Sequence, residues 1–402
     1  MRRVRPADEG SVGVVRTRAL DLPGPLALDC GRTLAPVRIA YEAYGELSVA
    51  RDNVILVCHA LSGDAHAAGW SDDPTAPSAV DGAGAGGRAH GGLGWWDGMI
   101  GPGKAFDTDR YFVVCTNLIG SCRGSTGPGS VDPATGRPYG TTFPVVTVHD
   151  MVRAQAAFLD ELGIRTVFAA SGGSLGGMQA IEWALQLPDR IRSFIPIAAT
   201  AALGTQGVAW NAIARNAIMA DPDWQGGMYE GTGRAPTAGI KVARMLGHMT
   251  YLSDAAVRER FGRRFQERDE PSYDLERADF AIESYLRHQS EGFAKRFDAN
   301  AYLYTSRALT YYDVARRYGG GSLARAFSRV RASALLLSFS SDWLYPPRDS
   351  EEIARAMRAN GRDATHVVID ADYGHDSFLL EERRMTEQIS AFLDRVARER
   401  VA

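Results

Sequence analysis

The sequence predicts a mostly parallel, doubly wound α/β sheet with a helical lid inserted into it. Short apolar runs rich in Val, Ile, Leu or Phe alternate with helical patterns, and this alternation is typical of parallel strands joined by helices. Strands that are buried on both faces have such continuous apolar runs. We predict them at residues 53–58, 111–116, 166–170, 194–198, 334–339 and 366–370, with helices at 148–162 and 178–187 between some of them.

Helical patterns without strand-like runs fill the long stretch between the fourth and fifth predicted strands. They lie at residues 208–219, 239–251 and 280–297, and acidic and basic side chains are balanced around the last of them, as on solvated helix faces. We therefore predict a core domain made of residues 1–202 and 332–402 and a helical lid domain made of residues 203–331. A lid of this kind excludes water and shapes a ligand pocket.

The composition indicates an ordinary globular protein. Hydrophobic residues make up 45% and charged residues 23% of the 402 residues, which excludes a disordered or fibrous chain. A net charge of -3 gives no global reason to expect nucleic acid as a partner. The four cysteines lack C-x-x-C pairing, the N-terminus lacks the apolar stretch of a secretory signal, and no run of about 18 apolar residues occurs. We expect a cytoplasmic protein that does not span a membrane.

Glycine and alanine dominate residues 75–94. A phosphate-binding glycine loop needs a strand before it and a helix after it, and neither context is present here. We therefore expect a flexible surface loop in this segment.

The motif with the clearest chemistry is Gly172-x-Ser174-x-Gly176. It lies between a predicted strand and a predicted helix, which is the context of a nucleophile elbow. So sharp a turn forces the serine into strained backbone geometry, and glycines beside it remove Cβ atoms that would clash. We predict Ser174 as a nucleophile, with the helix N-terminus behind it favouring negative charge.

A serine hydroxyl needs a base and an orienting acid, and in the fold that carries this elbow they follow in the order Ser, Asp, His after late strands. His375 is the histidine of the last such loop, and Asp342 follows the preceding strand. Three other carboxylates are alternatives for the orienting acid; they are Asp370, Asp372 and Asp376. Each lies too close to His375 in sequence to sit behind its ring, so we prefer Asp342.

An oxyanion hole needs one backbone N–H from the residue after the serine and one from an early loop. The first is that of Leu175. For the second we predict the N–H of Leu61, in the loop after the first predicted strand. His59 in the same loop is expected to shape it rather than to act as a catalytic base.

Several segments together resemble the homoserine O-acetyltransferase family, whose members are acyl-CoA-dependent enzymes of methionine biosynthesis with the α/β-hydrolase fold. The likeness runs through nearly the whole chain. The segments that carry it are residues 41–45, 59–64, 95–97, 101–104, 124–128, 172–179, 297–300 with Tyr302, and 374–376. Because such motifs say more about chemistry than a shared fold does, we expect this chain to catalyse acyl transfer.

The resemblance also implies roles for individual residues. It implies Ser174, Asp342 and His375 as the triad, in agreement with the argument from the residues. It implies that Arg215 binds the carboxylate of an amino-acid substrate, which suits a planar guanidinium because two of its N–H groups can pair with the two carboxylate oxygens. It also implies that Asp376 binds the ammonium group of the substrate. It further implies a homodimer formed through the helical insertion. Acetyl-CoA is then a co-substrate, and the reaction needs neither a tightly bound cofactor nor a metal.

Two details bear on the donor and the acceptor. Ser121 stands where many family members have glycine, in a loop that borders the acyl site of the family. Leu344 and Tyr345 follow the triad aspartate as in acetyl-transferring members, whereas succinyl-transferring relatives tend to have arginine there. We therefore expect acetyl transfer to L-homoserine in a two-step cycle.

Other activities remain as alternatives. Succinyl could be the group transferred, and L-serine could be the acceptor, since a pocket discriminates one methylene only weakly. A plain esterase or thioesterase with the same triad is a further alternative, and a non-catalytic binding protein of this fold is another.

Overall fold

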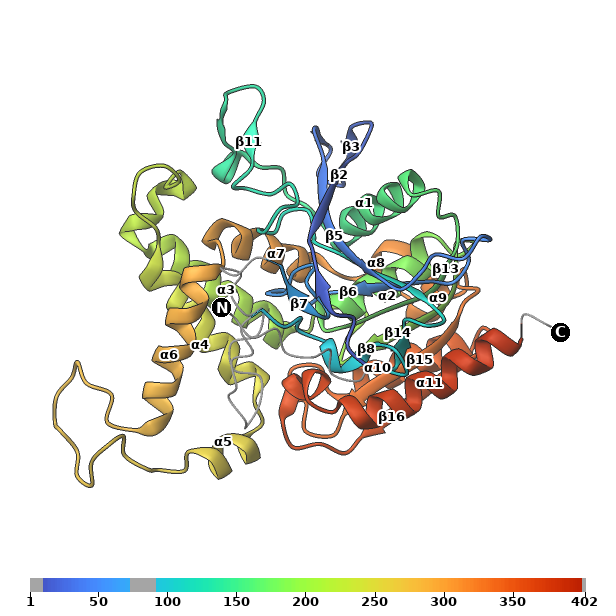
Figure 1. Ribbon diagram of the computed structural model, residues 1–402. Coiled ribbons are helices and arrows are strands. Elements are labelled where there is room, and N and C mark those ends of the chain that lie inside the picture. Colours follow the sequence, from blue (N-terminus) through green and yellow to red (C-terminus); the bar gives the residue numbers. More distant parts are fainter. Residues whose placement is uncertain (1–9, 73–91, 400–402) are drawn as a thin grey trace.

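An eight-stranded sheet forms the centre of the molecule in the computed structural model, which describes residues 10–72 and 92–399 (Figure 1). From one edge to the other its strands are β16 (Ala364–Ile369), β15 (Ser333–Phe339), β14 (Ile191–Ile197), β13 (Val167–Gly173), β6 (Val54–Cys58), β10 (Phe112–Thr116), β5 (Arg38–Tyr44) and β2 (Arg18–Asp21). Neighbouring strands from β16 to β10 pair in parallel, so the predicted mostly parallel sheet is confirmed.

The other edge of the sheet was not predicted. Strand β5 pairs antiparallel with β10, and β2 pairs antiparallel with β5. Strand β5 carries Arg38 and Glu42 among its apolar residues, so it lacks the continuous apolar run by which the other strands were found.

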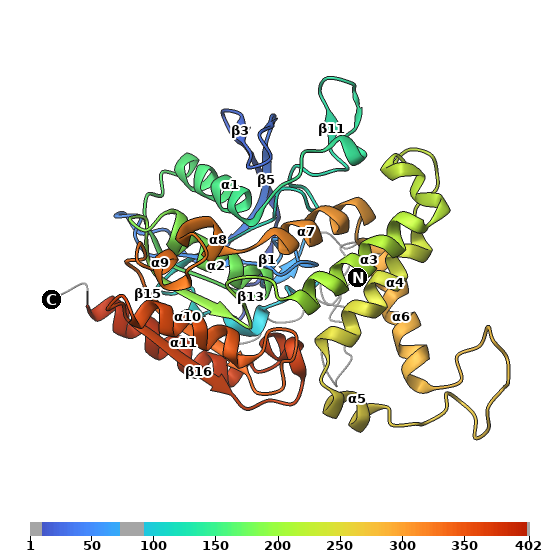
Figure 2. The same ribbon diagram turned by 180° about the vertical axis from the view of Figure 1, so that it is seen from behind.

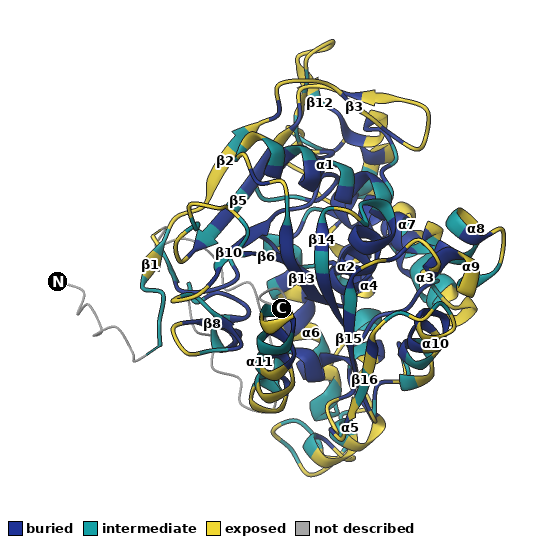
Figure 3. Cartoon of the chain, turned by 90° about the vertical axis from the view of Figure 1, so that its right-hand side faces the viewer, coloured by how far each residue is buried: buried dark blue, intermediate teal, exposed yellow. Residues whose placement is uncertain are grey.

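Both faces of the sheet are buried, because alternate residues of a strand point to opposite sides. In β15, Ala334 and Leu336 belong to one hydrophobic core and Leu335 and Leu337 to the other. Helices α1 (Val148–Glu161), α2 (Leu175–Gln186) and α10 (Pro347–Arg358) contribute to the first core, and α11 (Glu382–Arg398) contributes to the second. The central strands accordingly lie deep in the molecule, as the dark blue segments in Figure 3 show.

Short elements decorate this core within the described ranges. Two-residue strands pair locally; they are β1 (Val14–Val15), β3 (Leu26–Ala27), β4 (Thr33–Leu34), β7 (Trp70–Ser71), β8 (Ile100–Gly101), β9 (Phe106–Asp107), β11 (Val131–Asp132) and β12 (Arg137–Pro138). Single 3-10 turns are η1 (Asp97–Met99), η2 (Gly140–Thr142), η3 (Pro222–Gly227) and η4 (Gly374–Leu379).

Helices fill the connection between β14 and β15, where the lid was predicted. They are α3 (Thr205–Ala220), α4 (Thr237–Tyr251), α5 (Asp254–Arg260), α6 (Ala281–Arg296), α7 (Ala299–Tyr311), α8 (Val314–Gly319) and α9 (Leu323–Phe327). Opposite views show α3 to α6 projecting to one side of the sheet (Figures 1 and 2). The last three helices instead pack against the core. For example, Tyr312 donates from its hydroxyl to the carbonyl oxygen of Met178 in α2 over 3.0 Å.

Two sequence-based predictions concern segments that lie partly or wholly outside the residues that the structure describes. The N-terminal residues 1–9 and residues 75–91 of the glycine- and alanine-rich segment lie outside the described residues. Among the helices that the structure describes, none combines the length and the apolar character needed to cross a bilayer.

Candidate active site

Ser174 lies at the turn between β13 and α2, at the carboxyl end of the parallel strands. Its backbone has φ 58° and ψ -123°, a conformation that costs free energy for any residue with a Cβ. A Cβ atom on Gly172 would lie 2.2 Å from the carbonyl oxygen of Cys58, and one on Gly176 would lie 2.0 Å from it. The two glycines therefore allow strand β6 to approach the turn, which holds Ser174 in its strained position.

The other two members of the predicted triad are in contact. His375, in η4, donates from Nδ1 to Oδ2 of Asp342 over 2.8 Å, and both residues are buried. The remaining oxygen of Asp342 accepts the backbone N–H groups of Leu344 and Tyr345, each over 3.0 Å. With both oxygens bonded, the carboxylate is fixed in orientation and in turn orients the imidazole ring.

The second ring nitrogen of His375 takes no part in the contact with Asp342. Nε2 of His375 has no hydrogen-bond partner among the described residues, and Ser174 and His375 line the same cavity. The structure accordingly has no hydrogen bond between Nε2 and the Ser174 hydroxyl. Such bonds often tighten only when substrate is present. The structure thus brings the three residues of the predicted triad together at one cavity.

The predicted oxyanion loop is held beside the elbow by buried polar contacts. The side-chain amide of Gln179 in α2 donates to the carbonyl oxygens of His59 and Leu175, over 3.2 Å in each case. Leu61, two residues after His59, lines the same cavity as Ser174. The Leu175 N–H is the first of helix α2, and such an amide has no acceptor within its own helix. Both predicted donors thus lie on segments that meet at Ser174.

His59 has the structural environment expected for it. The ring is fully buried, and its Nδ1 lies 2.7 Å from the carbonyl oxygen of Ala60 and its Nε2 3.0 Å from Oδ1 of Asn117. Burial lowers the pKa of His59. Its ring nitrogens are engaged in shaping the loop.

Opposite charges line the cavity next to the triad without forming an ion pair. The cavity holds about 80 Å³, and its wall includes Arg244 from α4 and Asp376, the residue after His375. Both side chains are at least nine-tenths buried. Within the described residues, Asp376 has no hydrogen bond or ion pair, and Nε of Arg244 has no hydrogen-bond partner. Two buried, unpaired charges of opposite sign in one cavity suit a zwitterionic ligand.

Burial changes the acidity of Asp376. It raises the pKa of the carboxyl to about 6, although the positive charges of His375 and Arg244 oppose this shift. The carboxylate is therefore ionised at neutral pH but close to protonation in mild acid. An arriving ammonium group would stabilise the ionised form.

Arg215 is placed differently from the expectation. Its guanidinium is buried between α3 and α7, where Nη1 donates to Oγ1 of Thr310 over 3.0 Å and to the carbonyl oxygen of Ser306 over 3.3 Å. Burial lowers its pKa, and nearby Arg307 lowers it further. Arg215 does not line the triad cavity; two arginines of the helical insertion do, Arg244 from α4 and Arg296 at the end of α6.

Arg244 was missed in the sequence because one arginine on a helix carries little information in a chain rich in arginine. A weak signal was available. Ile240, Arg244, His248 and Tyr251 follow one another at helical spacing, and the first three are buried. An arginine on the apolar face of a helix needs either a partner or a ligand.

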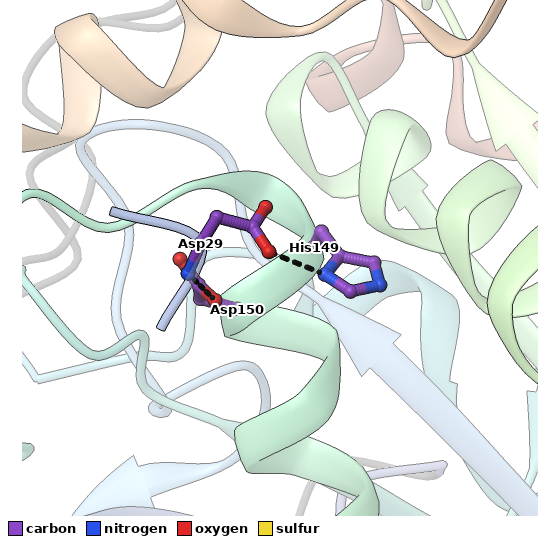
Figure 4. A group of neighbouring side chains, drawn as sticks. All are labelled: Asp29, His149 and Asp150. Carbon is purple, nitrogen blue, oxygen red and sulfur yellow. Dashed lines mark hydrogen bonds and ion pairs between the residues drawn. The ribbon is translucent and has the colours of Figure 1, made fainter. Parts of the chain in front are cut away.

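A cluster that could be taken for a metal site lies elsewhere. Asp29, His149 and Asp150 offer ligand atoms within 4.8 Å of one another (Figure 4). Guanidinium groups already pair with Asp29, however, that of Arg317 over 2.7 Å and that of Arg153 over 3.4 Å. A metal cation would have to compete with these two positive charges. The cluster therefore fastens the N-terminal segment to α1 and α8, a network that the sequence did not indicate.

Comparisons with known proteins cover nearly the whole chain. A model of the alpha/beta hydrolase fold matches residues 87–382. The homoserine O-acetyltransferase of Solidesulfovibrio magneticus is 48% identical over 388 residues, which cover 96% of this chain and 94% of that protein. The homoserine O-acetyltransferase of Mesorhizobium japonicum is 47% identical over 394 residues, which cover 98% of this chain and 96% of that protein.

Solved structures are similar to this chain over nearly the same part of its length as these relatives. The homoserine O-acetyltransferase from Bacillus anthracis superposes with a TM-score of 0.84 at 29% identity, covering 94% of this chain and 98% of that chain. A protein described as esterase E22 superposes with a TM-score of 0.83 at 30% identity, covering 94% of this chain and all of that chain. The predicted fold class is confirmed.

Proposed function

The chain belongs to the homoserine O-acetyltransferase family, and we propose that it transfers an acetyl group from acetyl-CoA to the hydroxyl of L-homoserine. Acetyl-CoA acts in this proposal as a co-substrate that leaves as free CoA. The observation that carries the proposal is the pair of buried, unpaired charges on Arg244 and Asp376 beside the triad, because L-homoserine is a zwitterion at neutral pH.

In the first half-reaction His375 accepts the proton of the Ser174 hydroxyl at Nε2. The serine Oγ attacks the thioester carbonyl, and the N–H groups of Leu61 and Leu175 stabilise the oxyanion that forms. The C–S bond then breaks, and the imidazolium returns its proton to the thiolate of CoA. Asp342 stabilises the imidazolium throughout this step. The product is an acetyl ester of Ser174.

In the second half-reaction homoserine enters the cavity that CoA has left. Its ammonium group pairs with Asp376, and its carboxylate pairs with Arg244. This orientation directs the hydroxyl toward Nε2 of His375, which accepts its proton while the oxygen attacks the acetyl ester. The Ser174 oxygen leaves and takes the proton back from His375. In this proposal Arg244 takes the role that the resemblance implies for Arg215.

The proposal is tested by a substrate panel that pairs acetyl-CoA or succinyl-CoA with L-homoserine or L-serine. We expect the highest kcat/KM for acetyl-CoA with L-homoserine. Leu344 and Tyr345 line a cavity beside Ser174 and bring no positive charge for a second carboxylate. A preference for succinyl-CoA or for L-serine would contradict the proposed donor or acceptor.

Hydrolysis is a second candidate function, because esterase E22 is similar over its whole length. An esterase would release CoA from acetyl-CoA at the same rate with and without homoserine. A transferase would release CoA in a burst equal to the enzyme concentration and continue only when homoserine is present. Measuring thiol release in both conditions separates the two functions.

We also propose that the protein is a homodimer formed through the lid. Packed against each other, α3 and α4 leave large apolar side chains exposed; these are Ile213 and Met219 on α3 and Val242 and Met249 on α4. Exposed apolar residues gathered on neighbouring helices are typical of an interaction surface. Light scattering should give the mass of a dimer, and the double variant Ile213→Asp, Val242→Asp should give a monomer. A monomeric wild type at micromolar concentration would contradict this proposal.

The proposed location is the cytoplasm. The described cysteines Cys30, Cys58, Cys115 and Cys122 are all free thiols, which persist in a reducing compartment.

A further inference from the structure

Two cavities meet at the nucleophile. The first is the triad cavity described above. The second holds about 50 Å³ and lies under the lid, between α3, α4 and α7. Leu61, Ser174 and Tyr251 line both cavities, so they form the boundary between them. Among the described residues, His375, Arg244 and Asp376 line the first cavity and not the second.

This division determines which part of the thioester enters which cavity. The tetrahedral carbon of the intermediate bears Oγ of Ser174, the oxyanion, the leaving group and the acyl substituent. The leaving sulfur and the attacking hydroxyl must both reach Nε2 of His375, so both lie in the first cavity. The oxyanion faces the N–H groups of Leu61 and Leu175. The acyl substituent is left to point into the second cavity.

The second cavity is larger than an acetyl group requires, and aliphatic and polar residues share its wall. The aliphatic part is supplied by Leu203, Ala214, Leu246, Leu309 and Leu344, and the polar part by Trp210, Asn211, Thr250, Tyr302 and Tyr345. A water-sized group needs roughly 10–15 Å³ of such volume, so about 50 Å³ accommodates three or four groups of that size. Acetyl places a single methyl group there, whereas the propyl group of a butyryl ester would occupy most of the space.

We propose that the second cavity is the acyl cavity and that this enzyme also transfers propionyl and butyryl groups from their CoA thioesters to the same acceptor. The inference rests on the proposed acyl transfer and specifies its donors as short, unbranched, uncharged acyl-CoA thioesters. The bonds are those of the acetyl reaction. The Ser174 Oγ–C bond forms and the C–S bond breaks, and the proton passes from the serine through His375 to the thiolate. Each additional methylene is buried against leucine side chains.

The first experiment measures kcat/KM with L-homoserine and the acetyl, propionyl, butyryl and octanoyl thioesters of CoA. We expect propionyl-CoA and butyryl-CoA within about tenfold of acetyl-CoA, and octanoyl-CoA lower by more than that, since rejecting one misfit methylene is worth roughly 10–200-fold. A loss above tenfold with propionyl-CoA or butyryl-CoA would overturn the inference. Octanoyl-CoA as active as acetyl-CoA would also overturn it, because a cavity of about 50 Å³ has no room for the longer chain.

Variants that fill the second cavity locate the acyl chain. In Ala214→Leu and Leu246→Phe the ratio of kcat/KM for butyryl-CoA to that for acetyl-CoA should fall at least tenfold. The matched control is Ala209→Leu, which adds the same atoms to an exposed position of the same helix and should leave the ratio unchanged. Leu246 is only partly buried, so its variant keeps the test valid if Ala214→Leu fails to fold. An unchanged ratio with a raised KM for homoserine would place the acceptor in this cavity and refute the inference.

A third measurement separates this inference from the proposed function. Each thioester is mixed with the enzyme in the absence of any acceptor, and mass spectrometry follows the acyl group on the peptide that contains Ser174. If butyryl-Ser174 forms at a rate close to that of acetyl-Ser174 while homoserine is never acylated, the result supports the assignment of the acyl cavity and contradicts the proposed acceptor. If acetyl transfer to homoserine is normal and butyryl-Ser174 does not form, the acyl cavity fails and the proposed function stands.

Discussion

Replacing Asp376 by Asn should stabilise the protein and damage its activity at the same time. Burial raises the pKa of this carboxyl from 3.8 to about 6, so ionising it costs the folded state free energy that the unfolded state does not lose. The difference corresponds to about 3 kcal/mol at 1.36 kcal/mol per pKa unit. Asn has nearly the same shape and no charge, and the carboxylate that it replaces makes no hydrogen bond among the described residues. The variant should therefore lose little and gain most of that free energy at neutral pH.

The sign of the pH dependence follows from the direction of the shift. Because the folded-state pKa of Asp376 is raised, the cost is fully present above pH 6 and disappears below the unfolded-state value of 3.8. Urea unfolding should show Asp376→Asn more stable than wild type by about 3 kcal/mol at pH 7.5, and by only about 1 kcal/mol at pH 4.5. Asp372→Asn is the matched control, since Asp372 is an exposed carboxylate of the same loop and should show no such difference.

The kinetic part of this prediction concerns the acceptor alone. Losing one partner of a buried charge pair costs roughly 2–5 kcal/mol, so the KM for homoserine should rise by about 10²-fold or more. Acetylation of Ser174 by acetyl-CoA should proceed at nearly the normal rate. In wild type, protonation of Asp376 should lower kcat/KM for homoserine as the pH drops below 6, and the variant should lack that contribution to the acid-side fall. A variant that is less stable than wild type at pH 7.5, or that binds homoserine normally, would refute the argument.

Three further substitutions test the site. Ser174→Ala should abolish acetyl transfer and leave the circular dichroism spectrum unchanged. Wild type incubated with acetyl-CoA alone should carry one acetyl group on the peptide that contains Ser174. An acetyl group on another residue would refute the assignment of Ser174 as the nucleophile. Asp342→Asn should remain folded and lose about 10⁴ in kcat, because the amide favours the wrong tautomer of His375, and activity within tenfold of wild type would assign the acid elsewhere. Arg244→Ala should raise the KM for homoserine steeply and Arg244→Lys should restore it only in part, whereas Arg215→Ala should lower the melting temperature by loosening α3 from α7. If Arg215→Ala raised the KM for homoserine and Arg244→Ala did not, Arg215 would be the residue that binds the carboxylate of homoserine.

Much of the architecture was predictable because local patterns encode it. Strands covered on both faces need continuous apolar runs, and all six predicted runs became neighbouring strands of the parallel sheet. The elbow was equally local: only glycine tolerates the approach of the Cys58 carbonyl oxygen at Gly172 and Gly176. The antiparallel strand β5 was missed because Arg38 and Glu42 interrupt its apolar residues.

What the sequence by itself determined is the set of groups whose position follows from neighbours along the chain. Ser174 must stand at a strand-to-helix turn, and His375 and Asp342 must follow late strands, so their meeting could be anticipated from strand order alone. Only the tertiary structure decided which arginines of the helical insertion reach the cavity beside Ser174; they are Arg244 and Arg296 and not Arg215. Arg215 and Arg244 occupy buried positions of neighbouring helices, and the packing of α3 against α7 turns Arg215 toward Thr310 while α4 presents Arg244 to the cavity. The physical reason is that the direction of a buried side chain depends on the helices that pack around it, which lie far from it in sequence.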